Sequence, residues 1–219
     1  MLKKIYSKLT SGTLSVRERI RRGSETDKAT RFWGELGSYH LSNDDDPTAI
    51  ARSKWLAREI LTLVSPSSVL EIGCNSGRNL KYIQEESPSV KLKGIDVNPR
   101  AIEYARSTKP GIQFELSDAN NWIEPVDNWD CAITMSVTDH IPEEATIELA
   151  RNIFRSCRAV IGVELWDGTS GKRALYKYSC DQRAVYESTG FTTLLWTRIP
   201  DYLQYDREKS PLWVYVGRR

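Results

Sequence analysis

The sequence has little of what marks several large classes of protein. Its 219 residues include two histidines, two methionines and four cysteines, and no two cysteines form a Cys-x-x-Cys pair. No apolar run approaches the ~20 residues that cross a bilayer, and the start of the chain has no apolar stretch of signal-peptide length. We therefore expect a cytoplasmic protein whose thiols are reduced and buried, at Cys74, Cys131, Cys157 and Cys180.

The net charge of the chain is also small. The formal net charge of +2 is too small to indicate a nucleic-acid-binding protein. The basic residues are uneven, however, because residues 1–22 hold seven Lys or Arg and one Glu. Leu2, Ile5, Tyr6 and Leu9 share one face at helical spacing, which predicts one or two short basic amphipathic helices. Such an arm can contact a membrane surface or phosphates, or it can be solvated or dock on its own domain.

What is present fits a single globular domain with an N-terminal extension. Hydrophobic residues make up 40% and charged residues 27% of the chain, which is ordinary for such a domain. Residues 23–46 are polar, and we expect them to be irregular. Asp46 is a good helix N-cap and Pro47 a good first helical residue, so a helix is predicted from Pro47 to about Val64. We expect an extension and cover segment over 1–46 and the main domain over 47–219.

Strands and helices alternate from residue 68 onward. Apolar runs predict strands over 68–72, 91–96, 112–116, 129–135, 158–165, 192–197 and 212–217, with helices over 78–86, 99–107, 142–157 and 180–189. This alternation predicts an α/β fold with a doubly wound, seven-stranded, mostly parallel sheet. The connection over 198–211 lacks a helical pattern, so we expect the last strand to run antiparallel.

The first of these strands ends in a glycine turn. Residues 69–79 predict a strand, a turn bracketed by Gly73 and Gly77, and the start of a helix. Such a turn brings backbone N–H groups and a helix dipole to a nucleotide. Asp96 ends the next strand, 23 residues after Gly73, where an acid binds ribose hydroxyls. Asp118 follows the third strand, where a carboxylate can accept from an adenine amino group.

Four segments together resemble the class I S-adenosylmethionine-dependent methyltransferases. They are Val-Leu-Glu-Ile-Gly-Cys-Asn-Ser-Gly at 69–77, Gly-Ile-Asp-Val-Asn-Pro-Arg-Ala-Ile at 94–102, Phe-Glu-Leu-Ser-Asp-Ala at 114–119 and Trp-Asp-Cys-Ala-Ile-Thr-Met at 129–135. The resemblance covers about residues 66–165 and implies a Rossmann-like fold, S-adenosylmethionine as cofactor and methyl transfer. Asn75 departs from the family's usual middle glycine, but Asn tolerates positive φ better than most residues. A dinucleotide dehydrogenase is disfavoured because the G-x-G-x-x-G turn is absent.

The resemblance also implies roles for individual residues. Gly73 and Gly77 would let the backbone approach the cofactor, Asp96 would bind the ribose, and Asp118 would face the adenine. Glu71 would bear indirectly on the methionine end. The full implied cofactor set is Glu71, Gly73, Cys74, Asn75, Gly77, Asp96, Val97, Asn98, Asp118, Ala119 and Ser136.

The loop after the fourth predicted strand is the expected place for catalysis. His140 is the candidate general base, since histidine titrates near neutral pH; the alternative is that it caps or packs against the following helix. Asp139 would orient His140 or act as the base itself. The loop has no Asn/Asp-Pro-Pro-Tyr/Phe run, which argues against methylation of nucleic-acid base amines. Two histidines without cysteines or acids at metal-ligand spacing do not predict a metal site.

We expect the acceptor pocket to come from segments outside the cofactor motifs. Its candidates are Tyr39, His40, Glu164, Trp166, Tyr176 and Tyr178, with Asp167 and Arg173 nearby. Aromatic side chains with acids suit a sugar or another polyhydroxylated ring, although the same residues can be packing at a sheet edge. The leading prediction is methyl transfer to a hydroxyl, with an amine as second choice, of a small molecule or glycan unit. The alternatives are an RNA or protein methyltransferase that docks through residues 1–22, and a non-catalytic cofactor-binding module. Oligomeric state is left open.

Overall fold

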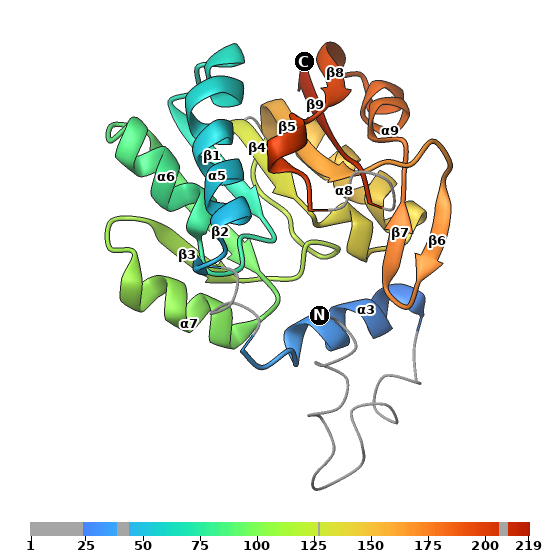
Figure 1. Cartoon of the computed structure of the whole chain (residues 1–219), viewed down its shortest axis with the longest axis horizontal. Helices are drawn as coiled ribbons and strands as arrows, with labels where there is room; N and C mark the ends of the chain where they lie inside the picture. The colour runs from blue at the N-terminus through green and yellow to red at the C-terminus, as the bar shows by residue number, and fades with distance from the viewer. Residues whose placement is uncertain (1–23, 39–43, 127, 206–209) are drawn as a thin grey trace, which may run out of the picture.

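A seven-stranded mixed sheet lies at the centre of the protein in the computed structural model, which describes residues 24–38, 44–126, 128–205 and 210–219 (Figure 1). The strand order is β3-β2-β1-β4-β5-β9-β8. The first five strands of this order pair in parallel, and β9 pairs antiparallel with both β5 and β8. The predicted sheet with its antiparallel last strand is therefore confirmed. Its strands are β1 Ser68–Ile72, β2 Lys91–Asp96, β3 Gln113–Leu116, β4 Trp129–Met135, β5 Cys157–Leu165, β8 Thr192–Arg198 and β9 Leu212–Arg218.

Helices cover both faces of this sheet. On one face the apolar sides of α5 Pro47–Trp55, α6 Arg78–Glu86 and α7 Pro99–Thr108 share a core with Val69 and Ile133. On the other face α8 Glu143–Ser156 and α9 Gln182–Thr189 pack with Leu70 and Ile72. Consecutive residues of β1 thus enter opposite cores, as the alternation of side chains along a strand requires.

The predicted helix boundaries rest on cap residues that the structure contains. The Asp46 side chain accepts a hydrogen bond from the Ala49 N–H at 2.8 Å and caps α5. Beyond α5 the helical path continues as a π turn over Leu56–Ile60 and a 3-10 turn over Leu61–Leu63, so it reaches Val64 as predicted. Gly190, with φ of 110°, ends α9.

Two segments differ from the sequence-based expectation. Residues 25–34, predicted to be irregular, form helix α3 Glu25–Gly34. Its start is a capping box, in which Ser24 Oγ accepts from the Asp27 N–H and Asp27 Oδ2 accepts from the Ser24 N–H. Residues 171–179, predicted to be a loop, contain a hairpin of β6 Gly171–Ala174 and β7 Lys177–Ser179. The expectation of irregular structure was wrong at both places.

Helix α3 and the β6–β7 hairpin lie side by side at one end of the sheet (Figure 1). Lys172 pairs with Glu25 at 2.6 Å, and the rings of Phe32 and Tyr176 are 5.1 Å apart. Helix α3 and the hairpin together form a wall beside the seven-stranded sheet and are not part of that sheet.

Several expectations concern the rest of the chain. The predicted helices over 1–22 and the candidates Tyr39 and His40 lie outside the described residues. All four cysteines are buried and form no disulfide. Within the described ranges, every helix is too short or too polar to cross a membrane. The division of the chain at residue 46 stays a prediction.

Candidate active site

A cavity of about 590 Å³ opens at the carboxyl ends of the parallel strands. This volume is within the ~300–1,000 Å³ range of pockets that hold small ligands. Ten of the eleven predicted cofactor residues line it: Glu71, Gly73, Cys74, Asn75, Asp96, Val97, Asn98, Asp118, Ala119 and Ser136. Gly77 is outside the lining and acts from behind, as the N-cap of α6.

The glycine turn is held close to its neighbours. A Cβ on Gly73, where φ is 70°, would lie 2.4 Å from Val137 Cγ2, and one on Gly77 would lie 2.5 Å from the Phe114 ring. Neither position accepts a side chain. Asn75 adopts a φ of 49°, the positive φ that is expected because it stands where the family usually has a glycine. The turn therefore packs closely against Val137 and Phe114, while Gly73 and Asn75 line the cavity.

Asp96 is fixed by backbone groups. Its Oδ2 accepts from the Asn75 N–H and its Oδ1 from the Asn98 N–H, both at 2.8 Å. Burial raises the pKa of Asp96, and these N–H groups oppose that shift. The Asn98 side chain donates to the carbonyls of Trp33 and Leu36, so it joins the end of α3 to this acid. Each Asp96 oxygen retains a lone pair for a ligand hydroxyl.

Asp118 is tied to α3 as well. Its Oδ1 accepts from the Asn120 N–H at 3.0 Å, and its Oδ2 accepts from the Thr30 hydroxyl at 3.3 Å. This acid therefore caps its own turn and also holds α3 against the end of β3.

Glu71 is a buried acid of the lining with one oxygen unpartnered within the described residues. It is 1% exposed, its Oε1 accepts from Asn79 Nδ2 at 2.6 Å, and its Oε2 has no hydrogen-bond partner among the described residues. Burial raises the pKa of Glu71 to about 8. A buried carboxylate oxygen without a partner costs free energy, so a ligand with an N–H or a positive charge is favoured beside it.

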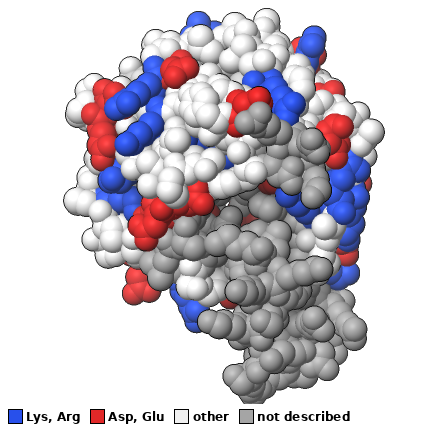
Figure 2. All heavy atoms as spheres, viewed as in Figure 1, with Lys and Arg blue, Asp and Glu red and all other residues white. Residues whose placement is uncertain are grey.

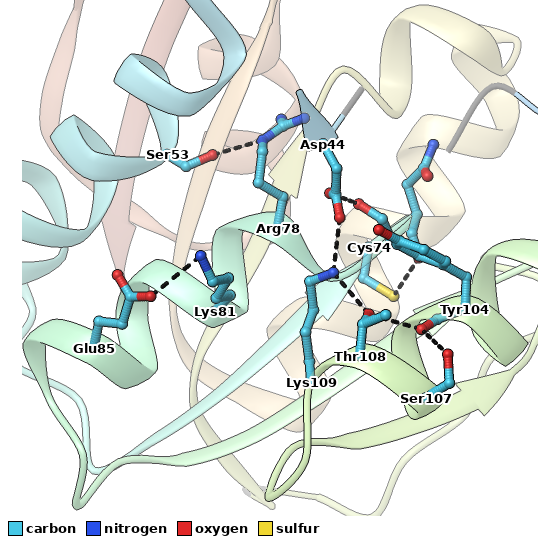
Figure 3. Close-up of polar contacts among 12 residues, drawn as sticks. Asp44, Ser53, Cys74, Arg78, Lys81, Glu85, Tyr104, Ser107, Thr108 and Lys109 are labelled. Carbon is cyan, nitrogen blue, oxygen red and sulfur yellow. Dashed lines mark hydrogen bonds and ion pairs between the residues drawn. The ribbon is translucent and has the colours of Figure 1, made fainter. Parts of the chain in front are cut away.

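The segment before α5 is anchored to the glycine turn. Asp44 accepts from Lys109 Nζ at 2.8 Å and from the Ser76 hydroxyl (Figure 3). Lys109 and Ser76 are both buried. This network joins the N-terminal cover, the turn and the end of α7 at one corner of the cavity.

The two predicted catalytic residues lie together. His140 and Asp139 belong to a 3-10 turn, Thr138–His140, and both line the cavity. His140 Nε2 is 3.5 Å from Asp139 Oδ1, and His140 Nδ1 is 3.2 Å from the Tyr176 carbonyl oxygen. The Trp33 ring lies against the imidazole, with centroids 4.1 Å apart. The ring is therefore oriented from three sides.

Glu164 supports this turn from below. It is 1% exposed, and its Oε2 accepts from the N–H groups of Val137 and Thr138 at 2.9 and 3.1 Å. Burial, with the charge of Asp139 nearby, raises the pKa of Glu164 to about 8. Glu164 does not line the cavity.

The remaining acceptor candidates are also outside the lining. Tyr176 is buried against α3 and Tyr178 is buried in the hairpin, so both side chains have packing positions. Trp166 is half-buried, and its backbone N–H donates to the Pro211 carbonyl at 3.0 Å. Tyr39 and His40 cannot be placed, since they fall outside the described residues.

Comparison with known proteins decides the family. Residues 47–184 match the family described as "Methyltransferase domain". The chain belongs to this methyltransferase family. A trans-aconitate 2-methyltransferase of Escherichia coli is 32% identical over 111 residues, which are 51% of this chain and 42% of that relative. The chain thus matches less than half of the relative's length.

Solved structures share the fold of this methyltransferase. The N-methyltransferase NodS of Bradyrhizobium japonicum WM9 in complex with S-adenosyl-l-homocysteine has a TM-score of 0.66 at 17% identity, over 90% of this chain and 99% of that one. The [4+2]-cyclase SpnF has a TM-score of 0.65 at 15% identity, over 78% and 81%. At these identities the likeness shows the fold alone.

S-Adenosylmethionine is the cofactor that the sequence motifs imply, and the cavity suits its chemistry. Asp96 offers fixed acceptors for ribose hydroxyls, and Glu71 offers an unpartnered oxygen for the ammonium of the methionine head. The roles of the individual residues stay predictions.

The cavity lining also contains residues that the sequence did not single out as site residues. They include Phe32 and Trp33 of α3, Arg52 of α5, Arg78 of α6, Lys177 of β7, Tyr205 and Ser210 of the β8–β9 connection, and Leu212 of β9. The Ser24/Asp27 capping box was the available signal for α3. For the others no signal exists, because they meet only through the tertiary fold.

Proposed function

We propose that this methyltransferase transfers a methyl group to a hydroxyl, with an amine as second choice, of a small molecule or glycan unit. The observation that carries the proposal is the Asp139–His140 pair in the cavity lining, on the turn after β4. A hydroxyl is a poor nucleophile until its proton is removed, and an imidazole is suited to remove it near neutral pH.

The contacts of His140 suit a general base. An Nδ1–H that donates to the Tyr176 carbonyl fixes the neutral tautomer with its lone pair on Nε2. When Nε2 takes the acceptor's proton, the imidazolium is stabilised by Asp139, 3.5 Å away. General-base catalysis of this kind contributes ~100- to 10,000-fold.

Two further groups hold this arrangement. Glu164 fixes the backbone of the turn through Val137 and Thr138, and the ring of Trp33 limits rotation of the imidazole. S-Adenosylmethionine supplies a methyl group on a positively charged sulfur, so the chain itself has to orient and deprotonate the acceptor. Orientation alone can contribute up to ~7–11 kcal/mol.

The relatives support a small acceptor without fixing it. Trans-aconitate, named for the E. coli relative, is a small polycarboxylate, and NodS is named an N-methyltransferase. The alternative of an RNA or protein acceptor depends on residues 1–22, which lie outside the described residues. The alternative of a non-catalytic cofactor-binding module is tested by turnover.

The experiment is turnover of methyl-labelled S-adenosylmethionine with a panel of hydroxylated, aminated and carboxylated small molecules. For a hydroxyl acceptor, His140→Ala should lower kcat by ~100-fold or more, while the Kd for S-adenosylhomocysteine stays within about threefold. Glu144→Ala, an exposed position in the first turn of α8, serves as control.

Two outcomes would contradict the proposal. One is full activity of His140→Ala from pH 6 to 9 on a hydroxylated acceptor. The other is a base-labile product, because methyl esters hydrolyse under alkaline conditions whereas methyl ethers and methylamines do not. An ionised carboxylate acceptor needs no general base.

A further inference from the structure

The β6–β7 hairpin turns at a residue whose backbone conformation does not suit its side chain. Ala174 pairs with Lys177, so Leu175 and Tyr176 form a two-residue turn. Tyr176 has a φ of 53°, in the left-handed region, although it carries a bulky aromatic side chain. A turn that needs positive φ at its second central residue usually has Gly or Asn there. Such a conformation persists only where the surrounding structure enforces it, and residues of this kind cluster at functional sites.

Packing of the Tyr176 ring enforces this conformation. Residues 172–175 are exposed, and Lys and Arg side chains gather on the side of the molecule where Figure 1 places the hairpin (Figure 2). Tyr176 is instead 4% exposed, and its ring centroid is 5.1 Å from that of Phe32, in a cluster with Ala29 of α3. Because the ring is fixed against α3, the peptide group that follows it is fixed as well, with its carbonyl beside His140.

The Tyr176 carbonyl and the Asp139 carboxylate compete for the ring hydrogen of neutral His140. The carbonyl oxygen is 3.2 Å from Nδ1, and Asp139 Oδ1 is 3.5 Å from Nε2. Both groups are acceptors, but a neutral imidazole has a single N–H. A hydrogen on Nδ1 leaves the lone pair on Nε2, whereas a hydrogen on Nε2 removes it. The contact at Nδ1 is within hydrogen-bond range and the contact at Nε2 is longer, so the structure favours Nδ1–H.

We propose that Tyr176 is a positioning residue, and that its strained backbone selects the Nδ1–H tautomer of His140. This tautomer leaves Nε2 free to accept a proton from the hydroxyl of the methyl acceptor. In the other tautomer Nε2 already carries hydrogen and His140 cannot act as the base. The inference rests on the proposed function and names the residue on which the base depends. It also gives a role to the hairpin, which is outside the seven-stranded sheet.

The test is the tautomer of His140, read from the NMR chemical shifts of its ring nitrogens in the ligand-free protein. The chain has two histidines, and a His40→Gln variant assigns their signals. At a pH where the imidazole is neutral, the wild type should show Nδ1–H. Tyr176→Gly removes the ring and adopts positive φ without strain, so it should populate Nε2–H. Tyr176→Phe keeps the ring and should retain Nδ1–H.

Two further variants separate positioning from a general loss of structure. Leu175→Gly changes the neighbouring residue of the same turn, which is 56% exposed, and should leave the tautomer unchanged. Phe32→Leu removes the ring partner from α3 without altering the hairpin, and should shift the tautomer in the same direction as Tyr176→Gly. In turnover of a hydroxylated acceptor, Tyr176→Gly should lower kcat ~10-fold or more. The Kd for S-adenosylhomocysteine should stay within about threefold.

The proposal is overturned if the wild type shows Nε2–H, or if folded Tyr176→Gly keeps Nδ1–H. If Tyr176→Gly does not fold, Phe32→Leu decides the question in the same way. The tautomer is read without an acceptor, so full activity of His140→Ala would contradict the proposed function without changing this result. A wild type that shows Nε2–H, yet loses turnover in His140→Ala, would overturn the role of Tyr176 and leave His140 as the base.

Discussion

The two ends of the cavity are built in different ways. At the proposed cofactor end, the groups come from strand ends and turns, and backbone N–H groups hold two of the acids, since Asn75 and Asn98 donate to Asp96 and Asn120 donates to Asp118. At the acceptor end, segments far apart in the chain meet through side chains, such as Lys172 with Glu25 and Arg52 with the Leu203 carbonyl. The first kind of site belongs to the fold, while the second belongs to this particular chain.

Replacing Gly73 by Ala should break the cofactor end most severely. The new Cβ would lie 2.4 Å from Val137 Cγ2 at φ of 70°. The left-handed conformation costs ~1–2 kcal/mol and the clash ~1–3 kcal/mol, so the free energy of unfolding should fall by roughly 2–5 kcal/mol. Because the turn has to move, the affinity for S-adenosylhomocysteine should drop ~100-fold or more. Denaturant titration and calorimetry measure the two effects.

Gly168→Ala is the matched control for that substitution. Its φ is 91°, and a Cβ there meets nothing within 4 Å. It should therefore lose about 1–2 kcal/mol through backbone strain alone, with cofactor affinity unchanged. Wild-type affinity in Gly73→Ala would mean that close approach of the turn is not what the cofactor end requires.

The contrast between the two ends also explains what the sequence could predict. The glycines, Asp96 and Asp118 occupy fixed spacings because a parallel βαβ unit repeats its geometry, so a linear pattern is enough to find them. The same regularity predicted the doubly wound, mostly parallel sheet that carries them. Even Asn75, which departs from the family pattern, adopts the positive φ expected of it.

The acceptor end carries no comparable pattern. The sequence shows Arg52 as one more basic residue of a helix, and its burial depends on a carbonyl 151 residues away. The sequence predicts Glu164, near the end of the strand over 158–165, as an acceptor ligand. Its carboxylate instead faces inward, beneath Val137 and Thr138. Which face of a central strand an acid occupies depends on its neighbours in space.

Two buried acids, Glu71 at one end of the cavity and Glu164 near the other, allow the two ends to be compared through their dependence on pH. Burial raises the pKa of both Glu71 and Glu164 to about 8, so both are mostly protonated at pH 7. The ammonium of S-adenosylhomocysteine beside Glu71 should favour the ionised carboxylate and release a proton on binding. Calorimetry at pH 7 in phosphate and Tris buffers counts that proton. Glu71→Gln should abolish the proton release and weaken the binding of S-adenosylhomocysteine ~10-fold. Glu164→Gln should keep the proton release and the affinity of the wild type.

The raised pKa values of Glu71 and Glu164 also determine how the stability of the ligand-free protein changes with pH. A carboxyl group that stays protonated in the folded state while the unfolded chain ionises costs stability as pH rises from about 4.5 to about 8. Glu71→Gln should reduce this decline, as should Glu164→Gln. If proton release on binding of S-adenosylhomocysteine persists in Glu71→Gln, the proton comes from another group, and Glu71 does not contact the ammonium of the ligand.

The smallest effect is expected for Asn75→Gly, which restores the residue type usual at this point of the turn. The N–H that binds Asp96 Oδ2 remains, and φ of 49° suits glycine. The substitution also removes the buried Asn75 Oδ1, which has no hydrogen-bond partner among the described residues. Against these gains stands the greater flexibility of glycine in the unfolded chain, ~0.4–1 kcal/mol. The free energy of unfolding should therefore change by less than about 1 kcal/mol, and the affinity for S-adenosylhomocysteine by less than about threefold.

Ser65→Gly, at φ of 44° and outside the cavity lining, reports the backbone contribution alone. A tenfold loss of affinity in Asn75→Gly, with none in Ser65→Gly, would mean that the Asn75 side chain contacts the cofactor, so that the cofactor end too depends on a side chain peculiar to this chain.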